Sequence, residues 1–341
     1  MKLCITGGGT GGHLMVAEAL AHSAVKNGYE VIFIGSQKGQ DKKYFENSSL
    51  FNDVYFLQTS GVVDKKGFGK ITSLFYIFKA FLQARNILKK HTIKATYSVG
   101  GFSSAPASFA TLSLKIPLFI HEQNAVEGRL NALLKPYTKN FISAYDSNST
   151  IKGYPVKESF FQYARVRKEL KTIVFLGGSQ GAKAINDLAL SLAIELKNRD
   201  IKIIHQAGEN DFERVKKSYM DLDISVELYS FTQELDKIIT RADLAISRAG
   251  ASTLWELTSN ALPTFYIPYP YSAGDHQYYN ARFIVDNNLG WCERENKNLK
   301  NSFLEILDNL SLEKKSEGLL NYATKDVADK MIEDLKSYIE K

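Results

Sequence analysis

The chain has 341 residues, of which 44% are hydrophobic and 23% are charged. This length is roughly twice that of a usual domain, so we expect two globular domains with substantial cores. No segment approaches about 18 consecutive apolar residues, and the apolar stretch before Gly7 is too short for a signal peptide, which excludes an ordinary membrane-spanning helix or a secreted protein. The two cysteines, Cys4 and Cys292, lie far apart, so the sequence predicts a cytosolic protein with reduced thiols.

The positive charge is concentrated in the first half of the chain. Residues 1–156 hold 18 Lys and Arg against 9 Asp and Glu, whereas residues 157–341 hold 25 against 28. Such a basic half either meets an anionic surface or ligand or is simply solvated by lysine, and charge alone leaves both interpretations open.

Short apolar runs rich in β-branched residues alternate with helix-like segments, a pattern that predicts βαβ units and parallel sheets. The predicted strands of the first half are 3–6, 31–34, 54–57, 95–99 and 118–121. Those of the second half are 172–176, 201–206, 225–229, 244–247 and 264–267. Each half opens with a strand that runs into a glycine cluster, so we predict two similar doubly wound α/β domains.

The boundary between these domains is predicted near Gly153-Tyr154-Pro155, where proline ends the preceding element. The second domain then covers residues 156–321. Residues 322–340 predict a terminal amphipathic helix, because apolar side chains recur there at a spacing of four. The sequence alone does not indicate on which domain this helix packs.

Four glycine-containing segments follow predicted strands, namely 7–12, 100–103, 177–181 and 248–252. Ligands of open parallel sheets bind beyond the carboxyl ends of the strands, where glycine lets the backbone approach a phosphate and a helix N-terminus offers free N–H groups. Four such segments in one chain therefore favour a phosphate-bearing ligand.

The first glycine segment matches the dinucleotide fingerprint G-x-G-x-x-G at Gly7, Gly9 and Gly12. That fingerprint also requires a ribose-binding carboxylate at the end of the second strand, which here continues into Gly35-Ser36. The P-loop pattern fails too, because His13 stands where its Gly-Lys-Ser/Thr sequence is needed. We therefore favour neither a nicotinamide enzyme nor an ATPase.

Residues 248–256 combine a glycine turn with the hydroxyl groups of Ser252 and Thr253 and the carboxylate of Glu256. A carboxylate in this position suits both hydroxyls of a ribose, with the helix N-terminus facing a diphosphate. The spacing from Thr253 to Glu256 is equally that of a helix capping box, so this alternative stays open.

His13, His121 and His276 fall at predicted strand or loop ends. None of the six histidines makes a local metal-binding spacing, so the sequence predicts no metal and no cofactor. His13 begins a helix directly after the first glycine segment, and its side chain is expected to point toward the ligand.

Taken together, these motifs resemble those of the MurG family, the peptidoglycan glycosyltransferases that add N-acetylglucosamine to lipid I. The resemblance spans nearly the whole chain and rests on the segments 8–13, 100–102, 121–124, 177–182, 248–256 and 275–277. It implies the α/β fold called GT-B, with two Rossmann-like domains facing across a cleft. Residues 1–155 with 322–341 would form the acceptor and membrane-side domain, and residues 156–321 the domain that binds the UDP-sugar.

The same resemblance implies which residues bind the donor UDP-N-acetylglucosamine. They are Thr10, Gly11, Gly12, Asn124, Lys157, Ser179, Thr232, Ala251, Ser252, Thr253, Glu256 and Gln277. Lys157 departs from the family, which usually has arginine there, and lysine lacks the planar guanidinium fork. Its part in donor binding is therefore the weakest of these assignments.

The reaction implied is an inverting transfer from UDP to the C4 hydroxyl of N-acetylmuramic acid, which gives a β-1,4 link. The attacking hydroxyl needs a general base, for which His13 is the first candidate and Glu122 the second, with Asn124 as an orienting group. A UDP-N-acetylglucosamine 2-epimerase and a non-catalytic nucleotide-sugar-binding protein are the alternatives.

Residues 69–90 predict a helix with a wide apolar, aromatic arc and basic residues at its margins. Such a helix suits the interface of an anionic membrane, although an arc that packs on the sheet is the alternative. We therefore expect a peripheral protein on the cytoplasmic face of the bacterial inner membrane, with lipid I as acceptor and no nucleic acid partner.

Overall fold

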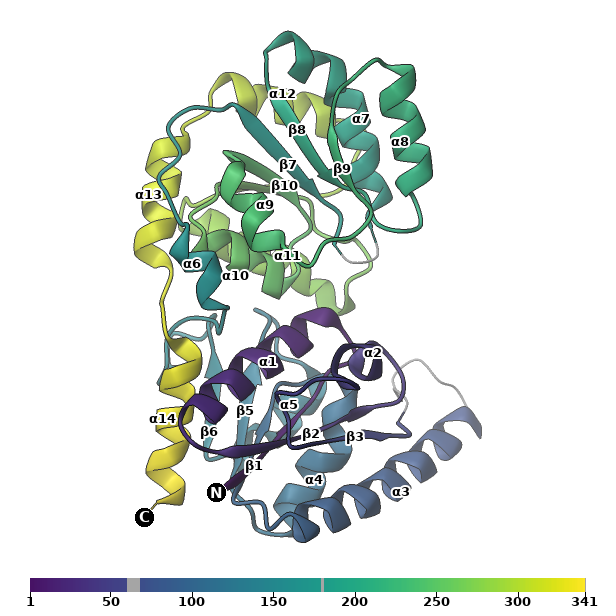
Figure 1. Ribbon diagram of the computed structural model, residues 1–341, viewed down its shortest axis with the longest axis vertical. Helices are drawn as coiled ribbons and strands as arrows, with labels where there is room; N and C mark the ends of the chain where they lie inside the picture. The colour runs from purple at the N-terminus through teal and green to yellow at the C-terminus, as the bar shows by residue number, and fades with distance from the viewer. Residues whose placement is uncertain (60–67, 179–180, 341) are drawn as a thin grey trace. The chain divides into compact units, whose positions relative to one another are not determined.

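The computed structural model describes residues 1–59, 68–178 and 181–340, with residues 68–74 described by their backbone alone. The chain divides into two compact units (Figure 1). One comprises Met1–Val156 together with Lys325–Lys341, and the other comprises Lys157–Thr324. The assignment of an acceptor role to the first unit and a donor role to the second stays a prediction.

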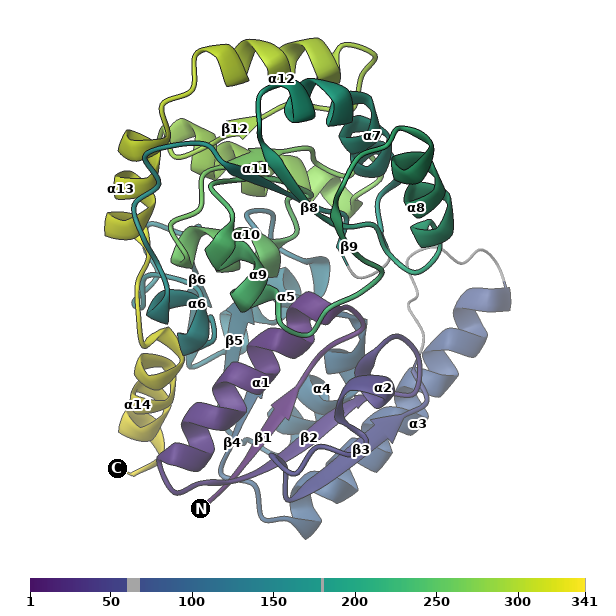
Figure 2. The same cartoon turned by 45° about the horizontal axis from the view of Figure 1, so that its top comes forward.

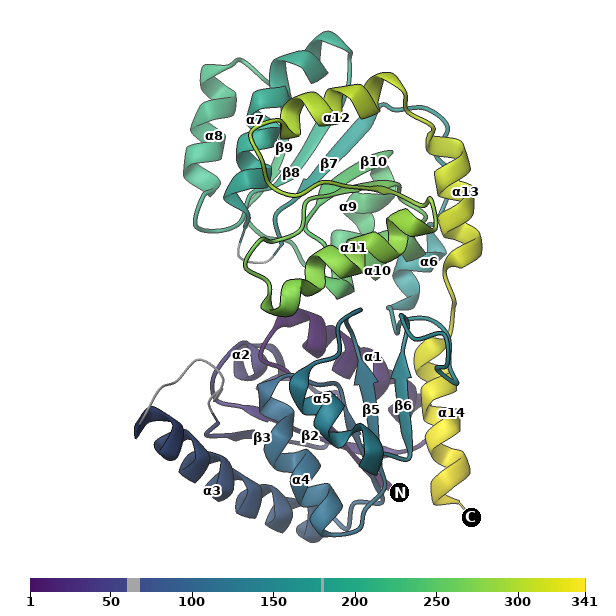
Figure 3. The ribbon, with the colours of Figure 1, turned by 180° about the vertical axis from the view of Figure 1, so that it is seen from behind.

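The first unit is built on a parallel six-stranded sheet with the strand order β3-β2-β1-β4-β5-β6. Its strands are β1 (Lys2–Thr6), β2 (Glu30–Ser36), β3 (Asp53–Leu57), β4 (Ala95–Ser98), β5 (Leu118–Glu122) and β6 (Asn140–Ser143). Its helices are α1 (Gly11–Lys26), α2 (Asp41–Phe45), α3 (Phe68–Lys90), η1 (Phe102–Ser104), α4 (Ala105–Ser113), α5 (Arg129–Leu134), η2 (Lys135–Tyr137) and α14 (Val327–Ile339). Figures 1 and 3 show helices on both faces of this sheet.

Burial on both faces explains why the strands of this sheet are continuous apolar runs. Residues 31–34 of β2, for example, have no exposed surface. A parallel sheet covered by helices on both sides requires such strands, since neither face meets water. The predicted strands were recognisable for this reason.

The terminal helix α14 packs on the first unit, beside α1 (Figure 2). Its Asp329 carboxylate accepts hydrogen bonds from the Ser23 hydroxyl and the Lys26 ammonium group of α1. Asp334 accepts a hydrogen bond of 2.8 Å from the Asn140 side chain of β6. The C-terminal segment therefore belongs to the same unit as the N-terminal half of the chain.

The second unit repeats the plan with the strand order β12-β11-β10-β7-β8-β9, again all parallel. Its strands are β7 (Thr172–Leu176), β8 (Lys202–Gln206), β9 (Glu227–Tyr229), β10 (Leu244–Ser247), β11 (Thr264–Tyr266) and β12 (Trp291–Cys292). Its helices are α6 (Glu158–Gln162), α7 (Lys183–Asn198), α8 (Phe212–Asp221), α9 (Leu235–Arg241), α10 (Ala251–Ser259), η3 (Ala273–Asp275), α11 (His276–Asp286), α12 (Leu299–Asp308) and α13 (Leu312–Tyr322).

A buried arginine anchors the carboxyl end of α10 in this unit. The Arg167 side chain has no exposed surface and donates hydrogen bonds to the carbonyl oxygen of Ala242 (3.3 Å) and the side-chain oxygen of Asn260 (2.5 Å). Burial lowers the pKa of Arg167 to about 9, so the group stays charged at neutral pH. Since Asn260 directly follows α10, these bonds hold the helix whose other end carries the predicted donor residues.

Both sheets have the strand order of doubly wound Rossmann-like domains, which confirms the predicted class of fold. In this order the chain reverses direction between β1 and β4 and between β7 and β10, and the crevice at such a switch point is where ligands bind. The four predicted glycine segments follow these four strands. The fold thus brings the loops together in pairs, one pair in each unit.

In the first unit the paired loops touch through their backbones. The Gly8 N–H donates a hydrogen bond of 3.1 Å to the carbonyl oxygen of Gly100. Gly101 has a φ of +80°, and a Cβ there would stand 2.1 Å from the Gly8 carbonyl oxygen. Only glycine fits this close approach.

We expect Gly101→Ala to destabilise the first unit far more than Gly28→Ala. Gly28 has nearly the same φ, +79°, but nothing lies within 4 Å of a Cβ there, so its substitution costs only the left-handed strain of about 1 kcal/mol. At Gly101 the clash with backbone adds to that strain, for a loss of about 3 kcal/mol or more. Urea unfolding followed by circular dichroism measures both changes, and equal losses would contradict the close approach.

Candidate active site

The predicted site residues fall into two groups, one in each unit. The first group surrounds His13 and Glu122, and the second surrounds Glu256. Ser179 lies outside the described residues.

The glycine loop after β1 already holds an anion that belongs to the chain itself. The buried Asp41 carboxylate accepts hydrogen bonds from the backbone N–H groups of Gly9 and Ser36, the latter at 2.8 Å. Burial raises the pKa of Asp41, while these hydrogen bonds oppose that rise. The carboxylate therefore occupies N–H groups that a nucleotide phosphate uses in a dinucleotide-binding loop.

His13 is the third residue of α1, and two polar groups lie within hydrogen-bond distance of its Nδ1. Its Nδ1 lies 2.9 Å from the Thr10 hydroxyl oxygen and 3.3 Å from the Gln123 amide nitrogen. Its Nε2 faces Gly100, where an added Cβ would stand 3.4 Å away. The ring is therefore oriented by groups from the loops after β1 and β5, with Nε2 on the side of the loop after β4.

Glu122 is buried at the end of β5 and accepts three hydrogen bonds. Its Oε1 accepts from the Asn124 N–H at 3.0 Å, and its Oε2 accepts from the Gly128 N–H at 2.9 Å and the Asn131 amide at 2.8 Å. A carboxylate with these donors holds the loop after β5 and orients Asn124. These contacts favour His13 over Glu122 as the general base, and Glu122 as a catalytic residue stays a prediction.

His121 precedes Glu122 and is fully buried, and neither ring nitrogen has a hydrogen-bond partner among the described residues. Its ring packs edge-on against Tyr154, with the centroids 5.2 Å apart. Burial, together with the neighbouring His13, lowers the pKa of His121 to about 3. His121 is therefore uncharged at neutral pH and supports the strand rather than contributing a charge to the site.

In the second unit α10 begins at Ala251 with Gly250 as its N-cap, so the capping-box alternative is wrong. Thr253 is the third residue of the helix, too far along to cap it. The Glu256 carboxylate instead accepts a hydrogen bond of 2.9 Å from the Ser252 hydroxyl. Ser252, Thr253 and Glu256 thus share the first turns of one helix, whose leading N–H groups have no acceptor within the helix.

Glu256 is 5% exposed, and burial raises its pKa to about 7, against the lowering effects of Ser252 and of the Lys157 charge. Lys157, at the N-cap of α6, lies close enough for its charge to act on Glu256. A buried carboxyl beside a helix N-terminus and a lysine is able to accept the hydroxyls of a ribose while the N-terminus faces a diphosphate.

The loop after β11 is fixed from two sides. Arg248 donates hydrogen bonds to the carbonyl oxygens of Ile267 (3.0 Å) and Pro268 (3.1 Å). Gln277, at the start of α11, accepts a hydrogen bond of 3.0 Å from the Tyr269 N–H through its Oε1. The Gln277 oxygen is therefore engaged, which leaves its amide nitrogen as the group suited to a sugar hydroxyl.

Thr232 lies in the loop between β9 and α9, where its hydroxyl oxygen accepts a hydrogen bond of 3.0 Å from the Glu234 N–H. This contact orders the loop and leaves the predicted uracil contact of its backbone a prediction. In the described part of the chain, no three His, Cys, Asp or Glu side chains come together as a possible metal site.

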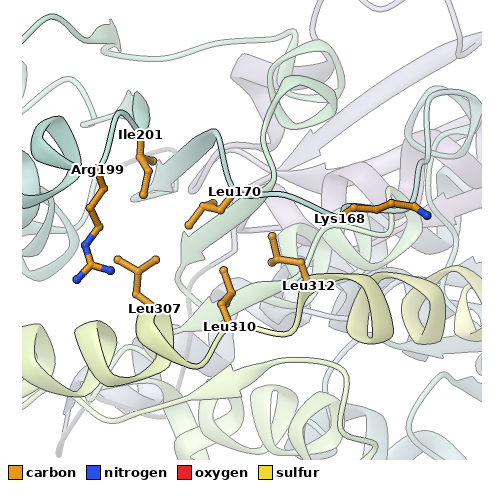
Figure 4. Close-up of a pocket in the computed structure, with 7 residues that line it drawn as sticks. All are labelled: Lys168, Leu170, Arg199, Ile201, Leu307, Leu310 and Leu312. Carbon is orange, nitrogen blue, oxygen red and sulfur yellow. The ribbon is translucent and has the colours of Figure 1, made fainter.

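A hollow of about 250 Å³ in the second unit is not a site of this kind (Figure 4). Leu170 and Ile201 on its wall precede β7 and β8, so the hollow lies at the amino ends of the strands, away from the switch point. Its cationic side chains, Lys168 and Arg199, already pair with carboxylates of Glu313 and of Glu195 and Asp308.

Three residues of the first site escaped the sequence analysis. Asp41 lies five residues beyond the strand whose end was searched for a carboxylate, and it reaches back through space. Gln123, just after β5, contacts His13, and Asn131, in α5, contacts Glu122. The position of Gln123 between Glu122 and Asn124, both predicted site residues, was the available signal.

Comparison with known proteins identifies the family to which the chain belongs. Residues 3–143 match the model of the glycosyltransferase family 28 N-terminal domain, and residues 172–337 match that of its C-terminal domain. The chain therefore belongs to glycosyltransferase family 28. This membership confirms that it is a glycosyltransferase.

Two bacterial relatives match over almost their full length. The protein from Sulfurimonas denitrificans is 62% identical, covering 98% of each chain, and that from Wolinella succinogenes is 54% identical, covering 99% of this chain and all of the other. Both are named UDP-N-acetylglucosamine--N-acetylmuramyl-(pentapeptide) pyrophosphoryl-undecaprenol N-acetylglucosamine transferase. The resemblance to the MurG family is thereby confirmed.

Solved structures support the fold. MurG of Acinetobacter baumannii matches with a TM-score of 0.80 at 24% identity, covering 98% of this chain and 99% of the other. A UDP-GlcNAc 2-epimerase from Neisseria meningitidis matches with a TM-score of 0.65 at 14% identity, covering 99% of this chain and all of the other. At these identities the likenesses concern the fold alone, and they confirm the two-domain GT-B class.

The raised pKa of Glu256 makes the stability of the second unit depend on pH. The ordinary pKa is 4.5, so between about pH 4.5 and pH 7 the unfolded chain is ionised while the folded protein keeps the proton. Stability from the neutral form is present below about pH 4.5 and is lost as the pH rises through about 7. Glu256→Gln lacks this dependence, so its stability relative to wild type should rise by about 3 kcal/mol between pH 4.5 and 8 in urea unfolding. A constant difference across that range would contradict the buried, proton-binding state.

Proposed function

We propose that this protein transfers N-acetylglucosamine from UDP-N-acetylglucosamine to the C4 hydroxyl of the N-acetylmuramic acid of lipid I. The product is lipid II, with a β-1,4 link, for peptidoglycan synthesis. The observation that carries the proposal is the match to transferases of this name at 62% and 54% identity over 98% or more of each chain.

The second unit supplies the groups for the donor. Glu256 accepts the ribose hydroxyls, the N-terminus of α10 at Ala251, Ser252 and Thr253 faces the diphosphate, and Gln277 donates to the sugar. The buried carboxyl of Glu256 and its bond to Ser252 support this arrangement, because a ribose replaces lost hydration with two hydrogen bonds. Thr232 and Ser179 complete the donor contacts in the proposal.

Departure of UDP leaves negative charge on the diphosphate. The oriented N–H groups at the start of α10 stabilise this charge without reorganisation, and Lys157 adds a positive charge nearby. Lysine acts there as a point charge, so the loss of the guanidinium fork costs geometry but not electrostatic attraction.

The first unit supplies the base and the loops for the acceptor. His13 Nε2 takes the proton of the C4 hydroxyl as the hydroxyl oxygen attacks the anomeric carbon of the donor sugar. Thr10, Gly11 and Gly12 at the N-terminus of α1, with Asn124, complete the donor site from this unit. The Asp41 carboxylate on the Gly9 N–H supports this division, because it leaves the loop without its full set of phosphate-binding groups.

Release of UDP tests the proposed reaction against its alternatives. With UDP-N-acetylglucosamine as donor, UDP should appear only when a lipid I analogue is present. A 2-epimerase would act on the donor without the analogue, and a non-catalytic binding protein would release no UDP in either case. Acceptor-independent turnover or no turnover would contradict the proposal.

His13→Ala should lower kcat by about 10²–10⁴-fold, because it removes the general base, while affinity for UDP stays close to that of wild type. Steady-state kinetics with the lipid I analogue and calorimetric titration with UDP measure the two effects separately. His22→Ala is the matched control, since it removes an exposed histidine of the same helix that lies outside the proposed site. An unchanged kcat in His13→Ala would contradict the proposed role of this residue as the general base.

We also propose that α3 binds the protein to an anionic membrane surface on the cytoplasmic side. No helix in the described part of the chain is long and apolar enough to cross a membrane. One stripe of α3, formed by Ala80, Ala84 and Leu88, is buried in the core of the first unit. The opposite stripe leaves Phe75 and Phe78 exposed at 65% and 59%.

The apolar arc predicted for residues 69–90 thus divides into two stripes with different partners. The buried stripe accounts for the packing alternative, and the exposed aromatic stripe remains for the membrane interface. The exposed Lys79, Lys89 and Lys90 lie on the same helix, where they suit anionic headgroups. Within residues 69–90, we therefore propose that the face of α3 that bears Phe75 and Phe78 contacts the membrane.

The double variant Phe75→Ser/Phe78→Ser should bind vesicles containing anionic lipid about tenfold more weakly or worse, because two aromatic side chains no longer enter the interface. Co-sedimentation measures this binding, and calorimetric titration should find UDP binding unchanged. Ile194→Ser/Met220→Ser is the matched control, since it removes exposed apolar side chains (55% and 71%) from the second unit. Equal vesicle binding by both double variants would contradict the proposed interface.

A further inference from the structure

The amide of Gln123 contacts His13 but has no part in the function proposed so far. Gln123 is 7% exposed, and its Nε2 lies 3.3 Å from His13 Nδ1. Its Oε1 is buried and has no hydrogen-bond partner in the described part of the chain. The nitrogen and oxygen ends of a carboxamide have nearly the same shape, so a rotation by half a turn exchanges them without changing the packing.

The two orientations of this amide demand opposite tautomers of His13. An N–H directed at Nδ1 requires Nδ1 to accept, which places the ring proton on Nε2. A carbonyl oxygen directed at Nδ1 accepts the Nδ1–H, which leaves the lone pair on Nε2. Only the second tautomer has a basic nitrogen on the side of Gly100, where the proposed reaction needs it.

We propose that Gln123 is a positioning residue that selects the tautomer of His13, by turning its Oε1 toward Nδ1–H. The proposal rests on the proposed role of His13 as general base. The Thr10 hydroxyl oxygen, 2.9 Å from the same nitrogen, is the second acceptor for this proton. Thr10 and Gln123 together hold the ring with Nε2 unprotonated before the acceptor binds.

The proton balance of the step is simple. Nε2 takes the proton of the C4 hydroxyl, the electron pair of that O–H bond forms the new bond to the anomeric carbon, and the pair of the broken carbon–oxygen bond leaves with UDP. His13 becomes an imidazolium whose Nδ1–H is still held by Gln123 Oε1. The imidazolium then returns its proton to solvent.

The charged neighbours of His13 do not replace Gln123 in this role. His121, on β5, is buried and uncharged at neutral pH. The Glu122 carboxylate, on the same strand, accepts a hydrogen bond from the Asn131 amide nitrogen, which also lies beside Gly100. The Glu122 carboxylate is engaged by three donors, so it leaves Nδ1 to the uncharged acceptors.

The test uses the full chain labelled with ¹⁵N-histidine, together with the pH dependence of kcat. In wild type the NMR shifts of His13 should report a protonated Nδ1 and an unprotonated Nε2. In Gln123→Glu the new carboxylate stabilises the imidazolium, so the pKa of His13 and the acid limb of the kcat profile should both move up by about one pH unit or more. In Gln123→Met, which keeps the volume without an acceptor, kcat should fall about tenfold with the KM for the donor unchanged.

Gln162→Glu, at the exposed end of α6 in the second unit, is the matched control and should change neither quantity. An Nε2-protonated ring in wild type, or a His13 pKa unmoved by Gln123→Glu, would overturn the proposal. A His13 pKa that rises while the kcat profile stays in place would uphold the tautomer assignment and overturn His13 as the base.

Discussion

The site of the first unit depends on the contact between the backbones of the loops after β1 and β4. The Gly8 N–H bonds the Gly100 carbonyl, and no side chain fits between the two loops at Gly101. This contact fixes where α1 begins, and hence where His13 stands relative to the loop after β5. The positions of His13, the proposed base, and of the residues around it therefore depend on one close approach between two glycine-containing turns.

The two units have sheets of the same topology but differ in the position of one buried carboxyl group, Asp41 in the first and Glu256 in the second. In the first unit the Asp41 carboxylate accepts a hydrogen bond from the Gly9 N–H, so an internal anion occupies the glycine loop, and the proposed role of this loop is to position His13. In the second unit Glu256 accepts a hydrogen bond from the Ser252 hydroxyl and lies beside a helix N-terminus whose leading N–H groups lack acceptors in the helix. This difference supports the proposal that the first loop serves the acceptor and the second unit holds the donor.

The sequence predicted ten of the twelve strands in the described residues, the edge strands β3 and β9 among them, because apolar runs between turns leave a clear pattern. It missed β6 and β12, which lie at sheet edges, since a strand of two residues such as Trp291–Cys292 has no periodicity to detect. It also left the capping box at Thr253 open, because only backbone geometry shows that Gly250 is the N-cap. Asp41 and Gln123 act across the fold, so their partners are not neighbours in sequence, whereas His13 stood out because its glycine loop precedes it directly.

A crystal structure of the complex with UDP-N-acetylglucosamine tests most directly the proposal that the second unit binds the nucleotide and that the glycine loop of the first unit does not. We expect the ribose hydroxyls to lie within hydrogen-bond distance of the Glu256 carboxylate, and Asp41 to keep its hydrogen bonds to the Gly9 and Ser36 N–H groups. A diphosphate bound to the Gly9 and Ser36 N–H groups, with Asp41 displaced, would contradict this proposal.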